Sequence, residues 1–237
     1  MSRLLLIIQH VPHEGPGLLA GVLDRYSIPF QTVDLSRGTP YPDPRNYSAV
    51  ITLGGPQSAN DDTAVMLNEL ANIRTILQNN IPYLGICLGM QVLVKAAGGE
   101  VKPCTVKETG FSGPDGHPFT VDLTQEGIQD PLFNGLGTNL RVFQLHGETV
   151  TLNNAITLLA TGKTCAHQIV KASSRAYGIQ SHFELTPQLL HSWLSIDNDL
   201  QAMDRGKLID FFREIQPDYE KTGTTVLKNF LRIAEII

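Results

Sequence analysis

Apolar residues follow two periods along the first hundred positions, one typical of strands and the other of helices. Short apolar runs bounded by turn residues predict strands covered on both faces. Stretches with apolar residues three and four apart predict amphipathic helices between them. The predicted strands are Leu4–Ile8, Phe30–Leu35, Ala49–Leu53 and Pro82–Ile86, and the predicted helices are Gly17–Tyr26, Asp61–Asn79 and Leu88–Ala97. Strands and helices in alternation predict a parallel sheet with helices on both faces.

The pattern changes after Gly99 to short apolar stretches separated by turn residues, which predict strands of a mixed or antiparallel addition. These stretches are Val101–Val106, Phe119–Leu123, Leu140–Leu145, Ile156–Ala160, Cys165–Lys171 and Ala176–Gln180. Two helical segments follow, Pro187–Ile215 and Thr224–Ile237, with a predicted break at Pro217 because proline cannot continue a helix. We therefore predict a single domain over residues 1–237. Its expected fold is an α/β three-layer sandwich with a mostly parallel central sheet and C-terminal helices.

Composition narrows the classes of function. The 237 residues carry a formal net charge of −5 and no cluster of Lys or Arg, so nucleic acid is not an expected partner. No stretch is apolar for long enough to cross a membrane, and the apolar start, Met1–Ile8, is too short for a secretory signal. The three cysteines show no paired spacing, which indicates free thiols in a reducing cytoplasm.

Cys87 lies where the predicted strand Pro82–Ile86 turns sharply into the predicted helix Leu88–Ala97. A cysteine there is raised above the sheet, and the helix N-terminus beneath it stabilises a thiolate. This is the geometry of a nucleophile elbow. Most cysteines in soluble chains are inert packing residues, but a packing cysteine does not need Gly85 and Gly89 around it. The sequence therefore makes Cys87 a candidate nucleophile, provided that a base lies elsewhere in the chain.

His182 is the candidate base, and Glu184 is the candidate group that orients it. The two residues follow the predicted strand Ala176–Gln180. In extended backbone they project to the same side, so the carboxylate can hold one ring nitrogen while the other accepts a proton from a thiol. A His-x-Glu pair in a solvated loop is the alternative interpretation. The histidines lack the paired spacing of a metal site, so no metal is expected.

Backbone N–H groups that could bind an oxyanion are expected at two places. Gly54-Gly55-Pro56 ends the predicted strand Ala49–Leu53, and glycines there let a backbone N–H approach a reacting carbonyl closely. Leu88, directly after Cys87, offers the second N–H. An ordinary turn after the strand is the alternative for the glycine pair.

These motifs together resemble the class I, or triad, glutamine amidotransferases, and they look closest to the amidotransferase domain of GMP synthetases and its stand-alone relatives. The motifs are Gly54-Gly55-Pro56, Gly85-Ile-Cys-Leu-Gly-Met-Gln91, Gly98-Gly99, His146-Gly-Glu148 and Tyr177-Gly-Ile-Gln-Ser-His-Phe-Glu184, with a weaker match at Thr222–Phe230. Glu108-Thr109-Gly110 also resembles a family feature, and we assign it no chemistry. The resemblance implies the flavodoxin-like amidotransferase fold, with a helical insertion at about residues 187–217.

The resemblance further implies a glutaminase half-reaction without a cofactor. Cys87 would attack the side-chain amide of glutamine, His182 would protonate the departing ammonia, and water would hydrolyse the glutamyl thioester to glutamate. Gly55 and Leu88 would supply the oxyanion N–H groups. The substrate would be held by Gln91 and by the backbone around Leu145, His146 and Gly147. Gln91 can equally be a helix residue that faces the sheet.

Three departures from the family pattern leave alternatives open. Phe183 replaces the usual proline between base and carboxylate, and Leu145 replaces a polar residue before His146. No acceptor domain follows the motifs, so a separate ammonia-accepting synthetase subunit is a possible partner. A γ-glutamyl peptidase with the same triad is the second enzymatic hypothesis. A non-catalytic binding or regulatory module is the hypothesis from another class.

Overall fold

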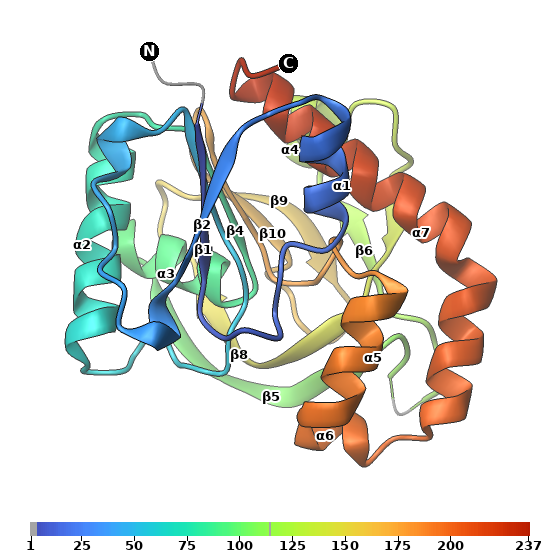
Figure 1. Ribbon diagram of the computed structural model, residues 1–237. Helices are drawn as coiled ribbons and strands as arrows, with labels where there is room; N and C mark the ends of the chain where they lie inside the picture. Colours follow the sequence, from blue (N-terminus) through green and yellow to red (C-terminus); the bar gives the residue numbers. More distant parts are fainter. Residues whose placement is uncertain (1–3, 114) are drawn as a thin grey trace.

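A central sheet and a smaller two-stranded sheet make up the β structure of the computed structural model, which describes residues 4–113 and 115–237 (Figure 1). The central strands are β1 Leu5–Gln9, β2 Phe30–Asp34, β3 Ala49–Thr52, β4 Tyr83–Ile86, β6 Thr120–Leu123, β7 Asn139–Arg141, β9 Thr157–Gly162, β10 Ile169–Ser173 and β11 Ala176–Ile179. They lie in the order β2-β1-β3-β4-β11-β10-β9-β6-β7. The smaller sheet pairs β5 (Glu100–Gly110) with β8 (Gln144–Thr151).

The first five strands of the central sheet, from β2 to β11, are parallel. The other four are antiparallel to their neighbours. In the parallel half, Thr52 pairs with Gly85 and Ile86 pairs with Ile179, so β3, β4 and β11 end at the same edge. This register brings the segments after three strands together, although the sequence separates them widely. The mostly parallel sheet predicted from the sequence is therefore confirmed.

Helices cover both faces of the sheet (Figure 1). The helices are α1 Leu18–Arg25, α2 Ala64–Gln78, α3 Leu88–Ala96, α4 Gln125–Gln129, α5 Pro187–Ile196, α6 Asn198–Gln201 and α7 Arg205–Ile233, with short 3-10 turns at Leu35–Arg37, Pro44–Asn46 and Pro131–Phe133. One face packs on α2 and α3, and the opposite face packs on α1 and the second half of α7. Alternate residues of β1 supply the two cores, Leu5 on one side and Leu6 on the other. This arrangement is the predicted three-layer sandwich.

A third apolar cluster lies beside the sheet and joins α5 and α6 to the first half of α7. Here the structure corrects the sequence prediction, because α7 runs unbroken through Pro217. Pro217 has no N–H, so the carbonyl of Arg213 lacks its helical hydrogen bond. Both residues are exposed, and water can bond to that carbonyl instead. The inward-facing Phe212 and Tyr219 keep both halves of the helix packed on the core. Packing thus offsets the cost of the proline.

Two predicted strands are displaced. The segment Leu140–Leu145 divides between β7 and β8, and β8 continues to Thr151. Polar residues such as His146 and Glu148 hide this strand, because its partner β5 belongs to a small sheet that is only partly buried. Cys165 lies in the loop before β10 instead of starting a strand. The general prediction of a mixed and antiparallel addition holds.

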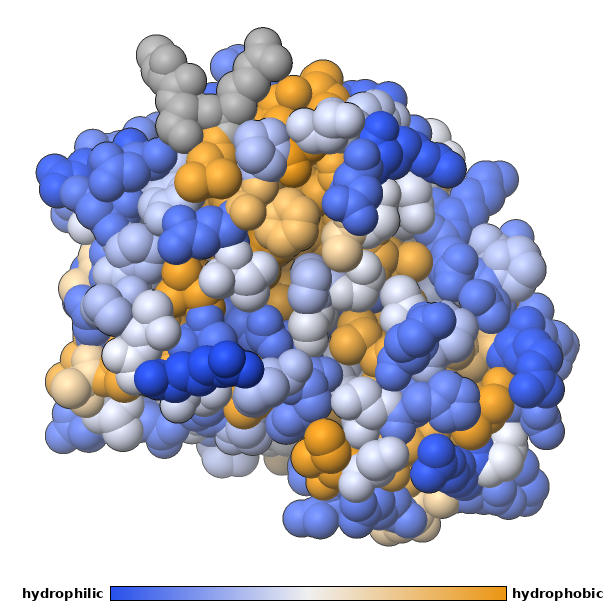
Figure 2. Space-filling view, viewed as in Figure 1, coloured by the Kyte–Doolittle hydropathy of each residue, from blue (hydrophilic) through white to orange (hydrophobic). Residues whose placement is uncertain are grey.

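The surface carries one visible concentration of apolar side chains on the face that contains β2, an edge strand of the central sheet (Figure 2). Phe30, the first residue of β2, is a large apolar side chain with 37% of its area exposed. Charged and polar residues dominate the rest of the view (Figure 2). Among the described residues, no helix combines the length and the apolar character needed to cross a membrane.

Candidate active site

Cys87 lies at the turn between β4 and α3 and has a backbone conformation rarely found outside glycine, with φ 52° and ψ −106°. Its N–H donates a 2.7 Å hydrogen bond to the carbonyl of Ile179 in the neighbouring strand β11. The residue therefore caps the sheet edge and begins the helix at once. This is the strand-to-helix elbow that the sequence predicted.

Gly85 and Gly89 are required by close backbone packing around this turn. A Cβ atom at position 85 would lie 2.3 Å from the carbonyl carbon and oxygen of Gly89. A Cβ atom at position 89 would lie 2.4 Å from the carbonyl oxygen of Thr52 in β3. Because these neighbours are backbone atoms, no rotamer change relieves the clash. The glycines let α3 approach the sheet closely enough to form the elbow.

His182 and Glu184 follow β11 and form a buried pair next to Cys87. Nδ1 of His182 lies 2.6 Å from Oε1 of Glu184, and the two side chains are 2% and 3% exposed. The hydroxyl of Tyr219 donates to the backbone carbonyl of His182. The imidazole also packs edge-on against Trp193, with ring centroids 4.9 Å apart. Since Nδ1 is held by the carboxylate, the other ring nitrogen is the one available to the Cys87 thiol.

The charge environment of His182 favours its protonated form. Burial lowers the pKa of the imidazole, but the Glu184 carboxylate and the hydrogen bond with Cys87 outweigh it, and the pKa lies well above 6.5. Glu14 faces the same site, and burial raises the pKa of its carboxyl group. A protonated His182 next to the sulfur would stabilise a Cys87 thiolate.

The loop after β3 is held by a buried histidine that the sequence analysis did not single out. Nδ1 of His10 donates to the carbonyl of Gly54 over 3.0 Å, while its Nε2 lies 3.0 Å from Oε2 of Glu69. Both residues are buried. Because C=O and N–H point in opposite directions in a trans peptide, this contact turns the N–H of Gly55 away from His10. The N–H of Leu88, at the start of α3, has no carbonyl four residues back to bond.

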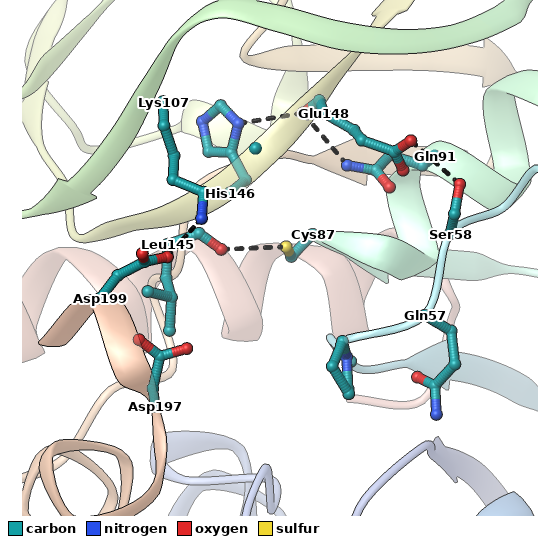
Figure 3. Close-up of a pocket in the computed structure, with 13 residues that line it drawn as sticks. Gln57, Ser58, Cys87, Gln91, Lys107, Leu145, His146, Glu148, Asp197 and Asp199 are labelled. Atoms are coloured by element: carbon teal, nitrogen blue, oxygen red, sulfur yellow. Dashed lines mark hydrogen bonds and ion pairs between the residues drawn. The ribbon is translucent and has the colours of Figure 1, made fainter. Parts of the chain in front are cut away.

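A pocket of about 390 Å³ opens over the sulfur of Cys87 (Figure 3). Six residues predicted from the sequence line it: Gly55, Cys87, Gln91, Leu145, His146 and Gly147. Its other lining residues are Pro56, Gln57, Ser58, Lys107, Glu148, Asp197 and Asp199. Leu88, His182 and Glu184 do not line the pocket. The structure thus gathers the predicted substrate-binding positions around one cavity.

Within this cavity, the thiol of Cys87 is 3.8 Å from the carbonyl oxygen of Leu145 (Figure 3). The amide nitrogen of Gln91 is 3.3 Å from the carbonyl of Glu148 and 3.3 Å from the side-chain oxygen of Gln180. These contacts fix the orientation of the Gln91 amide at the wall of the pocket. The imidazole of His146 turns from the pocket to Glu108, with Nε2 2.9 Å from Oε2. His146 therefore offers the pocket its backbone.

Several functional candidates had no clear sequence signal. His10 and Glu69 are 59 positions apart, and neither stands in a recognisable motif. Gln180, whose amide nitrogen lies 3.7 Å from the sulfur of Cys87, stood at the end of a predicted strand. Asp197 lies between α5 and α6 and Asp199 lies in α6, and the position of both at the pocket depends on tertiary packing.

The comparisons with known proteins agree with this geometry. The family model described as glutamine amidotransferase class-I matches residues 25–195, which is more than half of the chain. The glutamine amidotransferase-like protein YfeJ of Salmonella typhimurium is 27% identical over 193 residues, which cover 77% of this chain and 75% of that protein. GMP synthase of Edwardsiella ictaluri is 32% identical over 148 residues, or 60% of this chain and 26% of its own length. The chain thus matches about a quarter of the length of such synthases.

A solved structure gives the same result for the fold. The crystal structure of a glutamine amidotransferase from Methylobacillus flagellatus is 25% identical and superposes with a TM-score of 0.86. The alignment covers 98% of this chain and 96% of that one. The two chains therefore share their architecture over nearly their whole length.

Proposed function

The chain belongs to the class-I glutamine amidotransferase family, and we propose that it hydrolyses the side-chain amide of glutamine with Cys87 as the nucleophile. The observation that carries this proposal is the position of the buried His182 imidazole, which is held by Glu184 through Nδ1 and lies beside Cys87, since a Cβ atom at Gly54 would lie 3.3 Å from Cε1 of His182 and 3.5 Å from Cβ of Cys87. In this arrangement the thiol is the nucleophile, the imidazole is the base and the buried carboxylate orients the base.

In the proposed reaction, Cys87 gives its proton to His182 and its sulfur attacks the amide carbon. The N–H groups of Gly55 and Leu88 stabilise the negative charge that develops on the carbonyl oxygen. His182 then returns the proton to the departing nitrogen, so that ammonia leaves and a glutamyl thioester remains. A water molecule, deprotonated by His182, attacks the thioester and releases glutamate and the free thiol.

Gln91 and the backbone of Leu145–Gly147 are the proposed holders of the amino-acid part of the substrate. They line the cavity on the side of Cys87 that is bounded by β8. Leu145 contributes an apolar, half-buried side chain there, where a polar residue is common in the family. Substrate binding at this position would then depend on backbone groups rather than on the side chain.

A γ-glutamyl peptidase activity is the second candidate, and the reach of the pocket favours it. The cavity extends past Cys87 to Lys107, Asp197 and Asp199. Its volume of about 390 Å³ lies in the range that encloses ligands larger than one free amino acid. Lys107 and Asp199 form an ion pair there over 2.5 Å, so the far end of the cavity is polar. A leaving group attached to the γ-carbonyl would point toward this end.

The proposed fate of the ammonia is delivery to a separate synthetase subunit in the cytoplasm. GMP synthases share the amidotransferase region with this chain and continue well beyond it. A synthetase would have to dock over the pocket mouth, because ammonia must reach its acceptor without loss to water.

Assays of the purified protein with glutamine and with γ-glutamyl dipeptides test both candidates, with Cys87→Ala as the matched inactive variant. Release of ammonia and glutamate from glutamine supports the first, and cleavage of dipeptides alone supports the second. A glutamine-analogue electrophile should label Cys87 in either case. If neither substrate turns over and the electrophile leaves Cys87 unlabelled, the chain is a binding or regulatory module instead.

A further inference from the structure

Two thiols that the proposed reaction does not use lie on the far side of the pocket wall, beside His146. The sulfur of Cys104 is 3.6 Å from Nδ1 of His146. The sulfur of Cys165 is 3.1 Å from the hydroxyl of Thr149 and lies within 4.8 Å of a ring nitrogen of the same imidazole. All three cysteines of the chain are free thiols. Two of them are therefore paired in space without being joined.

The fold brings these thiols together from distant segments. Cys104 lies in the part of β5 where the pairing with β8 is interrupted, between Pro103 and Glu108. Cys165 lies in the loop between β9 and β10. Irregular backbone on both sides lets the sulfurs approach without disrupting a continuous strand pairing. Cys104 is partly exposed, whereas Cys165 is buried.

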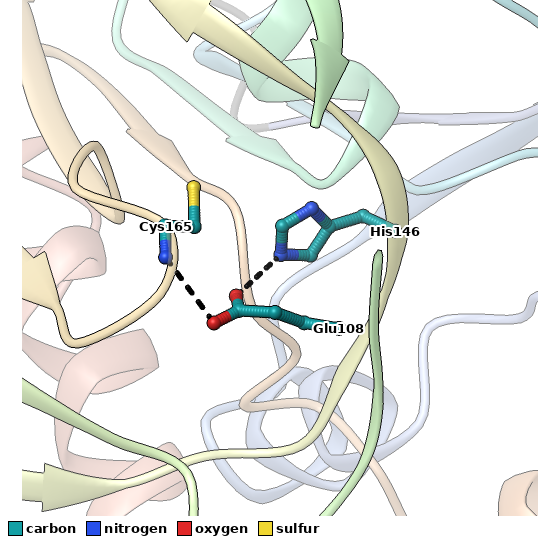
Figure 4. Close-up of side chains that lie close together, drawn as sticks. All are labelled: Glu108, His146 and Cys165. Carbon is teal, nitrogen blue, oxygen red and sulfur yellow. Dashed lines mark hydrogen bonds and ion pairs between the residues drawn. The ribbon is translucent and has the colours of Figure 1, made fainter. Parts of the chain in front are cut away.

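A metal site is one interpretation of this cluster, because ligand atoms of Glu108, His146 and Cys165 lie within 4.8 Å of one another. The hydrogen bonds point elsewhere. The carboxylate of Glu108 already accepts from Nε2 of His146 over 2.9 Å and from the backbone N–H of Cys165 over 3.3 Å (Figure 4). It also accepts from the amide of Gln168 over 3.0 Å. Protein donors thus satisfy Glu108 without a cation.

The same contacts hold the imidazole of His146 next to the thiols. Its Nε2 faces the Glu108 carboxylate, and its Nδ1 is 3.0 Å from the backbone carbonyl of Glu148. Both partners accept hydrogen bonds, and these contacts fix the orientation of the ring beside the two sulfurs. The charge interaction with His146 is one of the causes that lower the pKa of Cys165.

The pair shares its proton unequally. The hydrogen bond from the Cys104 thiol lowers the pKa of Cys165 to about 6, against the effect of burial and with smaller contributions from Thr149 and His146. The same contact raises the pKa of Cys104. The interaction therefore favours the thiolate at Cys165 and the thiol at Cys104. An attacking thiolate beside a thiol that can resolve it is typical of redox-sensitive sites.

We propose that Cys104 and Cys165 form a reversible redox pair that hydrogen peroxide oxidises to a disulfide. The Cys165 thiolate attacks one oxygen of peroxide, the O–O bond breaks, and hydroxide leaves, which gives a sulfenic acid on Cys165. The sulfur of Cys104 then attacks that of Cys165 and loses its proton, and the sulfenic oxygen departs as water. A dithiol reductant returns both thiols and is itself oxidised.

Thiol titration in the Cys87→Ala background tests this proposal, since the active-site sulfur is then absent. The denatured variant should show two free thiols after reduction, none after peroxide and two again after dithiothreitol. Peptide mapping without reduction should give one linked pair that contains Cys104 and Cys165. Two remaining thiols, or peptides oxidised separately, would overturn the proposal.

Two further variants in the same background separate the roles of the thiols. With Cys104→Ser, dimedone should trap a sulfenic acid on Cys165, because no thiol resolves it. With Cys165→Ser, Cys104 should remain a thiol at the same peroxide concentration. Equal oxidation of the two single thiols would contradict the assigned order of attack. Zinc that copurifies in stoichiometric amount and protects both thiols from peroxide would favour a metal site over the redox pair.

Discussion

Nδ1 of His10 lies 3.0 Å from the carbonyl oxygen of Gly54, and this hydrogen bond is buried. It fixes the peptide between Gly54 and Gly55, whose N–H is the proposed oxyanion donor. Burial lowers the pKa of His10, but the carboxylate of Glu69 and the bond to Gly54 raise it above its ordinary value. Glu69 and Gly54 thus favour the protonated imidazole, in which both ring nitrogens donate. His10 is thus a positioning residue that acts through the backbone of the loop.

Replacement of His10 by alanine is expected to slow amide hydrolysis with little change in KM. Loss of a direct oxyanion donor costs about 10²–10³ in kcat, so loss of the group that aims the donor should cost about 10- to 100-fold. His10→Asn, whose side-chain amide can still donate to Gly54, should recover part of the rate. Steady-state kinetics on glutamine or a γ-glutamyl dipeptide measure the split between kcat and KM.

Alkylation of Cys87 by iodoacetamide is the control for this prediction, because that reaction develops no oxyanion. The rate of alkylation should be the same in the wild-type protein and in His10→Ala. A parallel fall in alkylation and hydrolysis would mean that the substitution disturbs the elbow itself. His191→Ala, an exposed histidine on α5, should change neither rate.

Glu184→Gln is expected to destabilise the protein in a pH-dependent way. The folded-state pKa of His182 is raised well above 6.5, so its ion pair with Glu184 contributes stability fully below about pH 6.5 and loses it as pH rises through the folded pKa. Removal of one partner of a buried pair costs about 3–5 kcal/mol. The cost should therefore be largest below pH 6.5 and smaller in alkaline solution. Urea denaturation at several pH values measures it.

The matched control is Glu214→Gln on the exposed side of α7, which should change the free energy of unfolding by little at any pH. A cost for Glu184→Gln that stays constant from pH 5 to 10 would contradict the ion-pair interpretation. It would indicate that the carboxylate acts only through packing.

The fold was predictable where sequence pattern and burial coincide. Strands β1, β3 and β4 are buried throughout, so each appears as an unbroken apolar run. β8 alternates between buried and half-buried residues and is rich in polar side chains, so only Gln144 and Leu145 of this strand fell within a predicted strand. The passage of α7 through Pro217 depends on contacts of its inner face with α5 and the core, which no local signal reveals.

The site was predictable only in part, for a similar reason. Cys87 has a local signal in its two glycines, and His182 has one in its spacing to Glu184. That they meet follows from the pairing of β4 with β11, which is a property of the whole sheet. The pair of His10 and Glu69 depends on a contact between β1 and α2, so neither residue has a local signature. Cys104 and Cys165 likewise come together because both lie in irregular backbone segments, which their local sequence does not predict.

Gly89→Ala tests the close approach of α3 to the sheet. The new methyl group would lie 2.4 Å from the carbonyl oxygen of Thr52, so helix and strand must separate. Overpacking of this kind costs about 1–3 kcal/mol or more. Gly21→Ala is the matched control, because Gly21 is exposed on α1 and a Cβ there meets no atom within 4 Å. It should stabilise the protein by about 0.5–1 kcal/mol. Thermal or urea unfolding measures the change in stability of both variants. A change of the same sign in the two variants would contradict this account.

Cys87 is expected to store backbone strain, and replacement by glycine rather than alanine should release it. A non-glycine residue in a sparsely populated backbone region destabilises the folded state by about 1–3 kcal/mol. Glycine avoids this strain, but its greater conformational freedom in the unfolded chain lowers the stability by about 0.4–1 kcal/mol. Cys87→Gly should therefore be more stable than Cys87→Ala by about 1 kcal/mol, although both lack the thiol. Cys165, which is not among the residues with positive φ, provides the matched pair, and there the alanine variant should be the more stable. Urea denaturation of the four variants measures both differences. If alanine were the more stable residue at both positions, the elbow would be relaxed, and its unusual φ would give the nucleophile no stored energy.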